Sequence, residues 1–201
     1  GSSDPRIGAL SEKASVIAIY HGPGEKATMN SDERRNCMFR EMRRKKQQLS
    51  EAECAQILER GKTGVLAVVG DGGYPYTVPV NYVYTGGKIY FHGAKTGHKT
   101  DAIRTDGKVS FCVIDRDDVD AEKMTTLYSS VVLFGRARVL EDEGEKYRAA
   151  EALGLKYNSD RAAVEAEIRR EWSGLSCFEI TIEHMTGKEG RELTLARQKQ
   201  E

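Results

Sequence analysis

The fold is decided by Tyr74-Pro75-Tyr76-Thr77-Val78-Pro79-Val80-Asn81-Tyr82-Val83-Tyr84, then Thr85-Gly86-Gly87, then Lys88-Ile89-Tyr90-Phe91-His92. Both runs are rich in β-branched and aromatic residues, which favour strands, and the Gly-Gly between them is a hairpin signal. Pro79 has no N–H for a β ladder, so it indicates an edge or a bulge. We therefore expect backbone groups near Pro79 to be open to something other than a neighbouring strand.

The hairpin leads into the loop Gly93-Ala94-Lys95-Thr96-Gly97-His98-Lys99. A loop of this composition that opens onto a helix can bind a phosphate through backbone N–H groups and cationic side chains. The candidate phosphate donors are Lys95, Thr96, His98 and Lys99. From the residues alone, Lys95 and Lys99 are more readily explained as ordinary surface lysines than as phosphate ligands, and both alternatives stay open.

Length and charge exclude several classes of protein. The chain has 201 residues, which suits one domain with a sizeable core, and its 31 Lys plus Arg balance 31 Asp plus Glu. A nucleic-acid binder would show a basic excess. No apolar run approaches the roughly 20 residues that cross a bilayer, so we expect a cytoplasmic protein with no membrane span.

The four cysteines lie far apart and lack the clustered spacing of a metal site. Cys112 and Cys177 fall in apolar strand patterns, which predicts reduced, buried thiols. We expect no bound metal.

The N-terminal residues 1–37 read as an extension that is largely tail, with one apolar patch at 16–20. Residues 38–201 form the main domain. Its basic run at 40–46 is either a phosphate or nucleic-acid patch or, in a neutral chain, a solvated face. Ser50 and Glu53 make a capping box that begins a helix over 51–60, and Gly61 ends it.

The rest of the chain predicts mainly strands with peripheral helices. Strands are expected at 64–69, 108–114, 128–140 and 176–182, with a glycine turn at 70–73, a short helix at 100–104 and an acidic loop at 115–120. Gly135 suggests a bend or bulge in its strand. Residues 141–171 form a helical insertion. Six or seven strands arranged this way predict a mainly β protein, a small antiparallel barrel.

Several segments, in order, resemble the FMN-binding split-barrel superfamily typified by pyridoxamine 5′-phosphate oxidase. They are the hairpin with its loop (78–99) and residues 38–45, 108–113 and 183–189. The match is nearest to the 5-nitroimidazole-resistance, or nitroimidazole reductase, branch and spans residues 38–189. The resemblance implies a split β-barrel and a homodimer that holds FMN at its interface.

The resemblance also assigns the site. The flavin ring edge meets the backbone of Thr77, Val78, Pro79, Val80 and Asn81, its phosphate meets the loop donors named above, and a partner subunit adds Tyr128, Ser129 and Ser130. Asn81 is also explained as a residue that satisfies a strand end, and Trp172 by core packing as well as by a pocket wall. His92 is either structural or lies beside the flavin, where it donates a proton during nitro reduction.

No self-contained catalytic motif is present, which suggests that a cofactor carries the chemistry. The sequence therefore predicts an FMN-dependent oxidoreductase, resembling nitroimidazole reductases, that reduces nitroaromatic or related acceptors at the expense of a small-molecule electron donor. One alternative is a non-catalytic flavin- or haem-binding protein. Another is a pyridoxamine-phosphate oxidase-like enzyme, although that family's arginine-rich C-terminal motif is replaced here by Lys188-Glu189-Gly190-Arg191-Glu192-Leu193.

Overall fold

The structure is a computed structural model that describes residues 39–199. The chain divides into residues 1–39 and 40–201, and every element below belongs to the second unit. The predicted N-terminal tail and its apolar patch lie outside the described residues.

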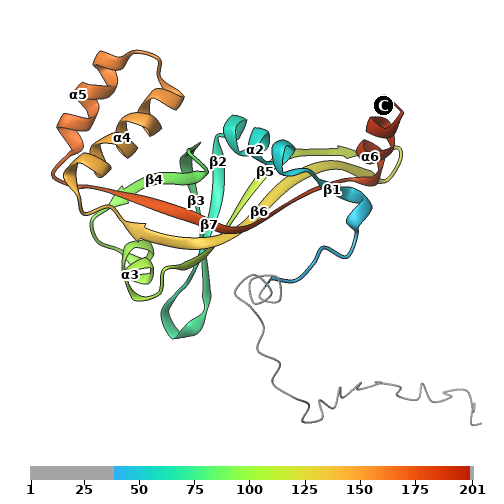
Figure 1. Cartoon of the computed structure of the whole chain (residues 1–201), viewed down its shortest axis with the longest axis horizontal. Coiled ribbons are helices and arrows are strands. Elements are labelled where there is room, and N and C mark those ends of the chain that lie inside the picture. Colours follow the sequence, from blue (N-terminus) through green and yellow to red (C-terminus); the bar gives the residue numbers. More distant parts are fainter. Residues whose placement is uncertain (1–38, 200–201) are drawn as a thin grey trace, which may run out of the picture. The chain divides into compact units, whose positions relative to one another are not determined.

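The strands form one antiparallel sheet that closes on itself (Figure 1). They run in the order β1-β7-β4-β3-β2-β5-β6, and β6 pairs again with β7. Their bounds are β1 Gln48–Leu49, β2 Thr63–Val69, β3 Pro75–Thr85, β4 Lys88–Ala94, β5 Lys108–Asp120, β6 Thr125–Val139 and β7 Leu175–Glu189. The predicted antiparallel barrel with a central hairpin is confirmed.

Helices pack against this barrel. They are α2 Glu51–Arg60, α3 His98–Thr105, α4 Glu143–Tyr157, α5 Arg161–Glu171 and α6 Arg191–Gln198, with short 3₁₀ turns at Lys45–Gln47 and Asp71–Gly73. Among them, α2 and α3 add buried side chains to the barrel core. The predicted capping box is present, since Ser50 Oγ accepts from the Glu53 N–H and the Glu53 carboxylate accepts from the Ser50 N–H. Within residues 39–199, no helix is long and apolar enough to cross a membrane.

Apolar side chains gather in two clusters on opposite faces of β4 and β7. The larger cluster fills the barrel with Tyr82, Phe91, Phe111 and Phe178, all at most 1% exposed. The smaller one lies beneath α4 and α5 and contains Leu140, Ala149, Ala150, Val164, Ile168 and Cys177. Successive strand residues point to opposite faces, so neighbours on β7 serve both clusters. The helical insertion is therefore packed against the barrel.

The predicted thiols differ in burial. Cys177 is buried, and burial raises its pKa to about 11. Cys112 is half-buried, and burial raises its pKa too. Both are free thiols, as predicted.

The acidic stretch 115–120 was predicted as a loop, and this is wrong. It is the end of β5, paired with the start of β6. The strand is not recognisable from the sequence because most side chains of this stretch are charged and face solvent at the exposed end of β5. β7 likewise continues seven residues beyond the predicted end, to Glu189. The bulge expected at Gly135 is confirmed by a register shift between Phe134 and Gly135.

Candidate functional site

A split between β3 and β4 is the first element of the site. β3 pairs with β2 from Pro75 to Asn81, but it pairs with β4 only from Tyr82 to Thr85. Within residues 39–199, no strand pairs with the other edge of Pro75–Asn81. Pro79 lies in this edge, where its missing N–H costs no ladder bond. The split therefore exposes a row of backbone groups.

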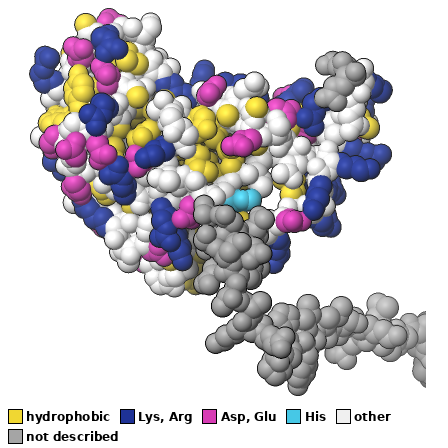
Figure 2. Space-filling model, in the orientation of Figure 1, with side chains coloured by type: hydrophobic (Ala, Val, Ile, Leu, Met, Phe, Trp, Pro, Cys, Tyr) yellow, Lys and Arg dark blue, Asp and Glu magenta, His cyan; other side chains and the backbone are white. Residues whose placement is uncertain are grey.

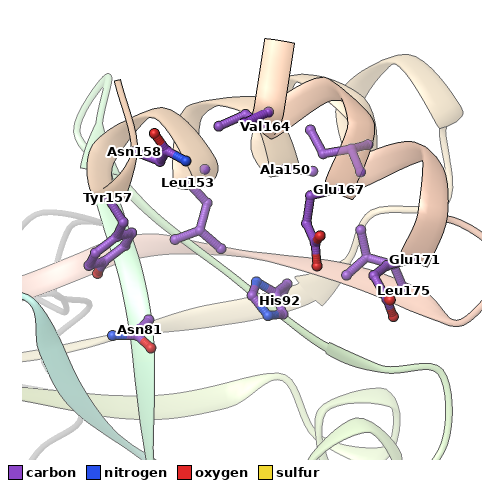
Figure 3. A pocket seen from close by; sticks show the side chains of 13 residues that line it. Asn81, His92, Ala150, Leu153, Tyr157, Asn158, Val164, Glu167, Glu171 and Leu175 are labelled. Carbon is purple, nitrogen blue, oxygen red and sulfur yellow. The ribbon is translucent and has the colours of Figure 1, made fainter. Parts of the chain in front are cut away.

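Two adjoining cavities open beside the split, with volumes of about 470 Å³ and 610 Å³. The first lies between the strands and the helical hairpin α4–α5 (Figure 3). The second runs along β3 and β4 toward α3. Both are lined by Asn81, His92, Glu167, Glu171 and Leu175. His92 therefore faces the junction of the two cavities.

Lys99 is the cation of the second cavity, which Pro79, Val80 and Gly93 also line. Its ammonium lies 5.6 Å from the ring centre of Phe91, and burial lowers its pKa. Within residues 39–199, no carboxylate forms an ion pair with it. A Cβ on Gly93 would come within 2.7 Å of Lys99 Nζ, so the glycine lets the lysine lie against β4. A half-buried cation without a counterion is suited to an anionic ligand.

His92 differs from the sequence expectation in its ionisation. Its ring is reachable from the cavity, but surrounding protein atoms and then the charge of Lys99 lower its pKa below 6.5. At neutral pH the imidazole is therefore mainly neutral, with one N–H to donate. This makes His92 a hydrogen-bond donor toward the cavity rather than a resident imidazolium.

The other predicted phosphate donors do not line either cavity. Lys95 and Thr96 are exposed in the turn before α3. His98 stacks on Tyr76 at 4.1 Å, and its Nε2 accepts the Asp71 N–H at 3.3 Å. His98 therefore contacts the β2–β3 turn, whereas Lys99, one residue later, faces the cavity.

The predicted ring-edge residues lie along β3. Thr77 and Val78 pair with β2, and the Val78 side chain packs on the barrel core. Asn81 donates its amide to the Lys62 carbonyl at 3.1 Å, so the strand-end explanation is correct for its Nδ2. The same side chain still lines both cavities.

The remaining predicted residues lie elsewhere in this chain. Ser129 donates to Asp115 at 2.7 Å, Tyr128 lies beneath Lys188, and Ser130 pairs with Lys188 in the β6–β7 ladder. A role in a partner's site stays a prediction. Trp172 packs in the smaller core cluster with Lys146 Nζ 3.8 Å above its ring, which favours the core explanation.

Sequence reasoning missed the helical wall of the first cavity. Leu153 and Tyr157 come from α4, and Glu167 and Glu171 come from α5. Glu167 and Glu171 share one helix face by their i, i+4 spacing. No local pattern links that face to His92, which lies 75 residues earlier in the chain.

A closed antiparallel barrel with this split and these cavities defines a split-barrel protein. Residues 50–189 match the family model described as pyridoxamine 5′-phosphate oxidase, and the chain belongs to that family. No curated protein sequence matches this chain.

Solved structures share the fold. A candidate 5-nitroimidazole antibiotic resistance protein of Bacteroides thetaiotaomicron is 19% identical, with a TM-score of 0.60 over 71% of this chain and 86% of that one. An FAD-binding protein of Mesorhizobium loti is 25% identical, with a TM-score of 0.53 over 71% and 96%. An FAD and heme binding protein of Mycobacterium smegmatis is 19% identical, with a TM-score of 0.56 over 75% and 80%.

Proposed function

We propose that this protein is a flavin-dependent oxidoreductase that binds FMN along the split and reduces nitroaromatic or related acceptors. The observation that carries the proposal is Lys99, a half-buried cation without an ion-pair partner among residues 39–199, beside the open backbone edge of β3. The flavin phosphate needs a cationic, charge-assisted donor. The ring edge needs backbone donors and acceptors. The residues present fit both demands.

Each residue has a defined task in this proposal. Lys99 binds the phosphate, and the β3 backbone from Thr77 to Asn81 holds the ring edge. When bound, the flavin supplies two-electron transfer. His92 donates a hydrogen bond to the acceptor and holds a proton near it, since reduction of a nitro group consumes protons. Lys95, Thr96 and His98 have at most a peripheral part, because the first two are exposed and His98 is held by the β2–β3 turn.

A homodimer with two equivalent flavin sites is part of the proposal. The second subunit would contribute Tyr128, Ser129 and Ser130. Sedimentation velocity should give a dimer, and a monomer that retains one tightly held flavin would contradict this part.

The decisive experiment is the visible spectrum of the purified protein, followed by anaerobic incubation with a reductant and a 5-nitroimidazole. Flavin bands with turnover support the proposal, and chromatography of the released cofactor separates FMN from FAD. A Soret band, or flavin bands without turnover, would favour the non-catalytic binder instead. That second candidate is kept because one similar structure is an FAD and heme binding protein.

Pyridoxamine-phosphate oxidation is disfavoured. An anionic substrate needs cations besides the one that binds the cofactor phosphate. All residues that line the first cavity lie within the described range 39–199, and none of them is a lysine or an arginine. Activity with pyridoxamine 5′-phosphate that matches turnover of a nitro compound would reverse this ranking.

A further inference from the structure

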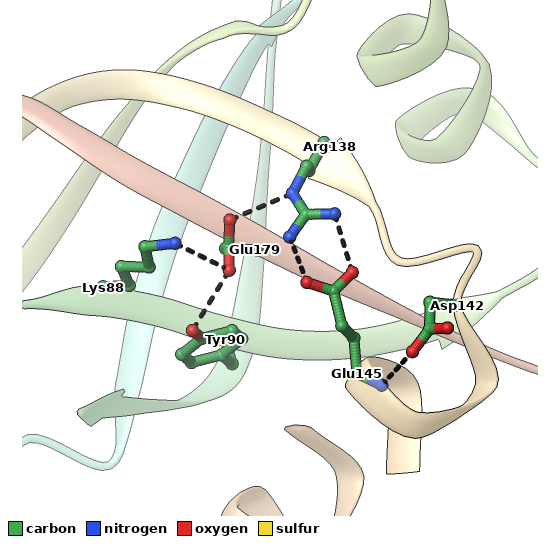
Figure 4. Close-up of polar contacts among 6 residues, drawn as sticks. All are labelled: Lys88, Tyr90, Arg138, Asp142, Glu145 and Glu179. Atoms are coloured by element: carbon green, nitrogen blue, oxygen red, sulfur yellow. Dashed lines mark hydrogen bonds and ion pairs between the residues drawn. The ribbon is translucent and has the colours of Figure 1, made fainter. Parts of the chain in front are cut away.

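The helical hairpin α4–α5 is fastened to the barrel at both ends of α4. At its N-terminus, Arg138 makes two hydrogen bonds to Glu145, of 3.0 and 2.9 Å, and a third of 3.0 Å to Glu179 (Figure 4). Glu179 is buried on β7 and also accepts from Lys88 and Tyr90. This network ties the first turn of the helix to three strands.

At the C-terminus of α4, two consecutive side chains reach the other side of the split. Lys156 Nζ donates to the Gly61 carbonyl at 2.6 Å and lies over the ring of Tyr82. The Tyr157 hydroxyl lies 2.5 Å from the Lys62 carbonyl and accepts the Tyr82 N–H at 3.1 Å. These contacts at both ends of α4 hold the hairpin over the first cavity.

The roof of this cavity is apolar. Ala150, Leu153 and Val164 come down from the helices, and Leu175 closes one side (Figure 3). Figure 2 shows exposed hydrophobic side chains among the charged side chains of the α4–α5 hairpin. A volume of about 470 Å³ lies within the range of small-molecule sites, roughly 300–1,000 Å³. The polar lining side chains come from both sides, with Asn81 and His92 on the strands and Glu167 pointing down from α5 toward His92 (Figure 3).

The charges around the cavity select among ligands. Glu167 and Glu171 line it, and Arg170 ion-pairs with both from outside the lining. Lys99 lies in the adjoining cavity, and Lys156 lies behind the lining, where its ammonium bonds to the Gly61 carbonyl beside Tyr157. If the flavin phosphate neutralises Lys99, the two carboxylates are the charged groups that directly line the first cavity. The flavin-loaded protein therefore presents a negative rim.

We propose that the cavity under the α4–α5 hairpin is the acceptor-binding pocket, and that it takes flat, apolar, uncharged or cationic molecules with the group to be reduced directed at His92, while it rejects anions. This inference rests on the proposed function, since it uses the bound phosphate to account for Lys99. It assigns substrate selection to the helical insertion rather than to the barrel.

The test uses three probes of equal size: 4-nitrobenzyl alcohol, 4-nitrobenzylamine and 4-nitrobenzoate. Calorimetry on the protein as purified, with its flavin content measured, should give the cationic probe the lowest dissociation constant, the neutral probe an intermediate one, and the anion one about tenfold weaker than the neutral probe. The double change Glu167→Gln with Glu171→Gln should remove most of that difference. Equal binding of all three probes to flavin-loaded wild type would overturn the charge argument.

Position in the cavity is tested with a matched pair of variants on one helix turn. Ala162 and Ala163 are both exposed on α5, but only Ala163 lines the cavity. Ala163→Phe should weaken the two favoured probes about tenfold or more, and Ala162→Phe should leave them within about twofold, at equal flavin content. Equal effects of the two changes would refute the pocket. A preparation without flavin would refute the proposed function instead, and this pair of variants would still report on the cavity.

Discussion

Replacing Lys99 by methionine removes the cation of the split while keeping an unbranched side chain against Phe91 and Phe178. A hydrogen bond to a charged group contributes about 1.5–3 kcal/mol, and each 1.4 kcal/mol is about tenfold in affinity. Lys99→Met should therefore weaken FMN binding about tenfold to a hundredfold. Riboflavin, which lacks the phosphate, should bind within about twofold of wild type.

The same change should act in the opposite direction on the flavin-free protein. Burial lowers the pKa of Lys99, which means that the folded state disfavours its charge. The flavin-free variant is therefore expected to unfold at the same temperature as wild type or higher. Lys95→Met is the matched control, because Lys95 is exposed and lines neither cavity; it should change neither binding nor stability.

The assay is a fluorescence titration of flavin-stripped protein with FMN and with riboflavin, together with thermal unfolding. Gly93→Ala offers an independent check, because its Cβ would lie 2.7 Å from Lys99 Nζ and displace the lysine without deleting it. It should reproduce the selective loss of FMN. Equal loss of both ligands, or a flavin-free Lys99→Met protein several degrees less stable than wild type, would refute the assignment of the phosphate to Lys99.

Other changes test separate parts of the structure. His92→Ala should slow anaerobic oxidation of the reduced flavin by a nitroimidazole about 10²–10⁴-fold and leave dithionite reduction unchanged; comparable oxidation rates would make His92 structural. Glu179→Gln should lower the free energy of unfolding at pH 7 by about 1–3 kcal/mol, measured in urea. Burial acts to raise the pKa of Glu179, but the hydrogen bonds from its three donors outweigh burial and lower the pKa below 4.5. The unfolded chain therefore binds the proton more tightly, and the stability advantage of wild type over Glu179→Gln should shrink as the pH falls from about 4.5. An advantage that grows at lower pH would contradict this sign. Gly135→Ala puts a Cβ 2.2 Å from a backbone carbonyl and should cost about 2 kcal/mol or more, whereas Gly174→Ala, with no atom nearer than 3.9 Å, should stay within about 0.5 kcal/mol.

The local chemistry of the sequence determined the elements around the split. The capping box at Ser50, the Gly-Gly hairpin and the bulge at Gly135 are each specified by a few adjacent residues, and all are present. Pro79 marked the open edge of β3 because a missing N–H is a property of one residue. The alternation of hydrophobic and polar residues does not reveal a strand that faces solvent on both sides. Residues 115–120 were therefore predicted as a loop.

Only the tertiary structure decided which side chains share the cavities. Lys99 and His98 are neighbours in sequence, yet the helix that starts there turns one into the second cavity and the other onto Tyr76. Glu167 joins His92 because α4 is held at both ends. Arg138 links Glu145 of the helix to Glu179, 41 residues further along the chain than Arg138, and Tyr157 bonds to the Lys62 carbonyl, 95 residues away. The spacing of hydrophobic residues shows that one face of a helix or strand is buried, but it does not show which other element covers that face. The lowered pKa of His92 likewise follows from the protein atoms around its ring and from a lysine seven residues away in sequence that folds back beside it.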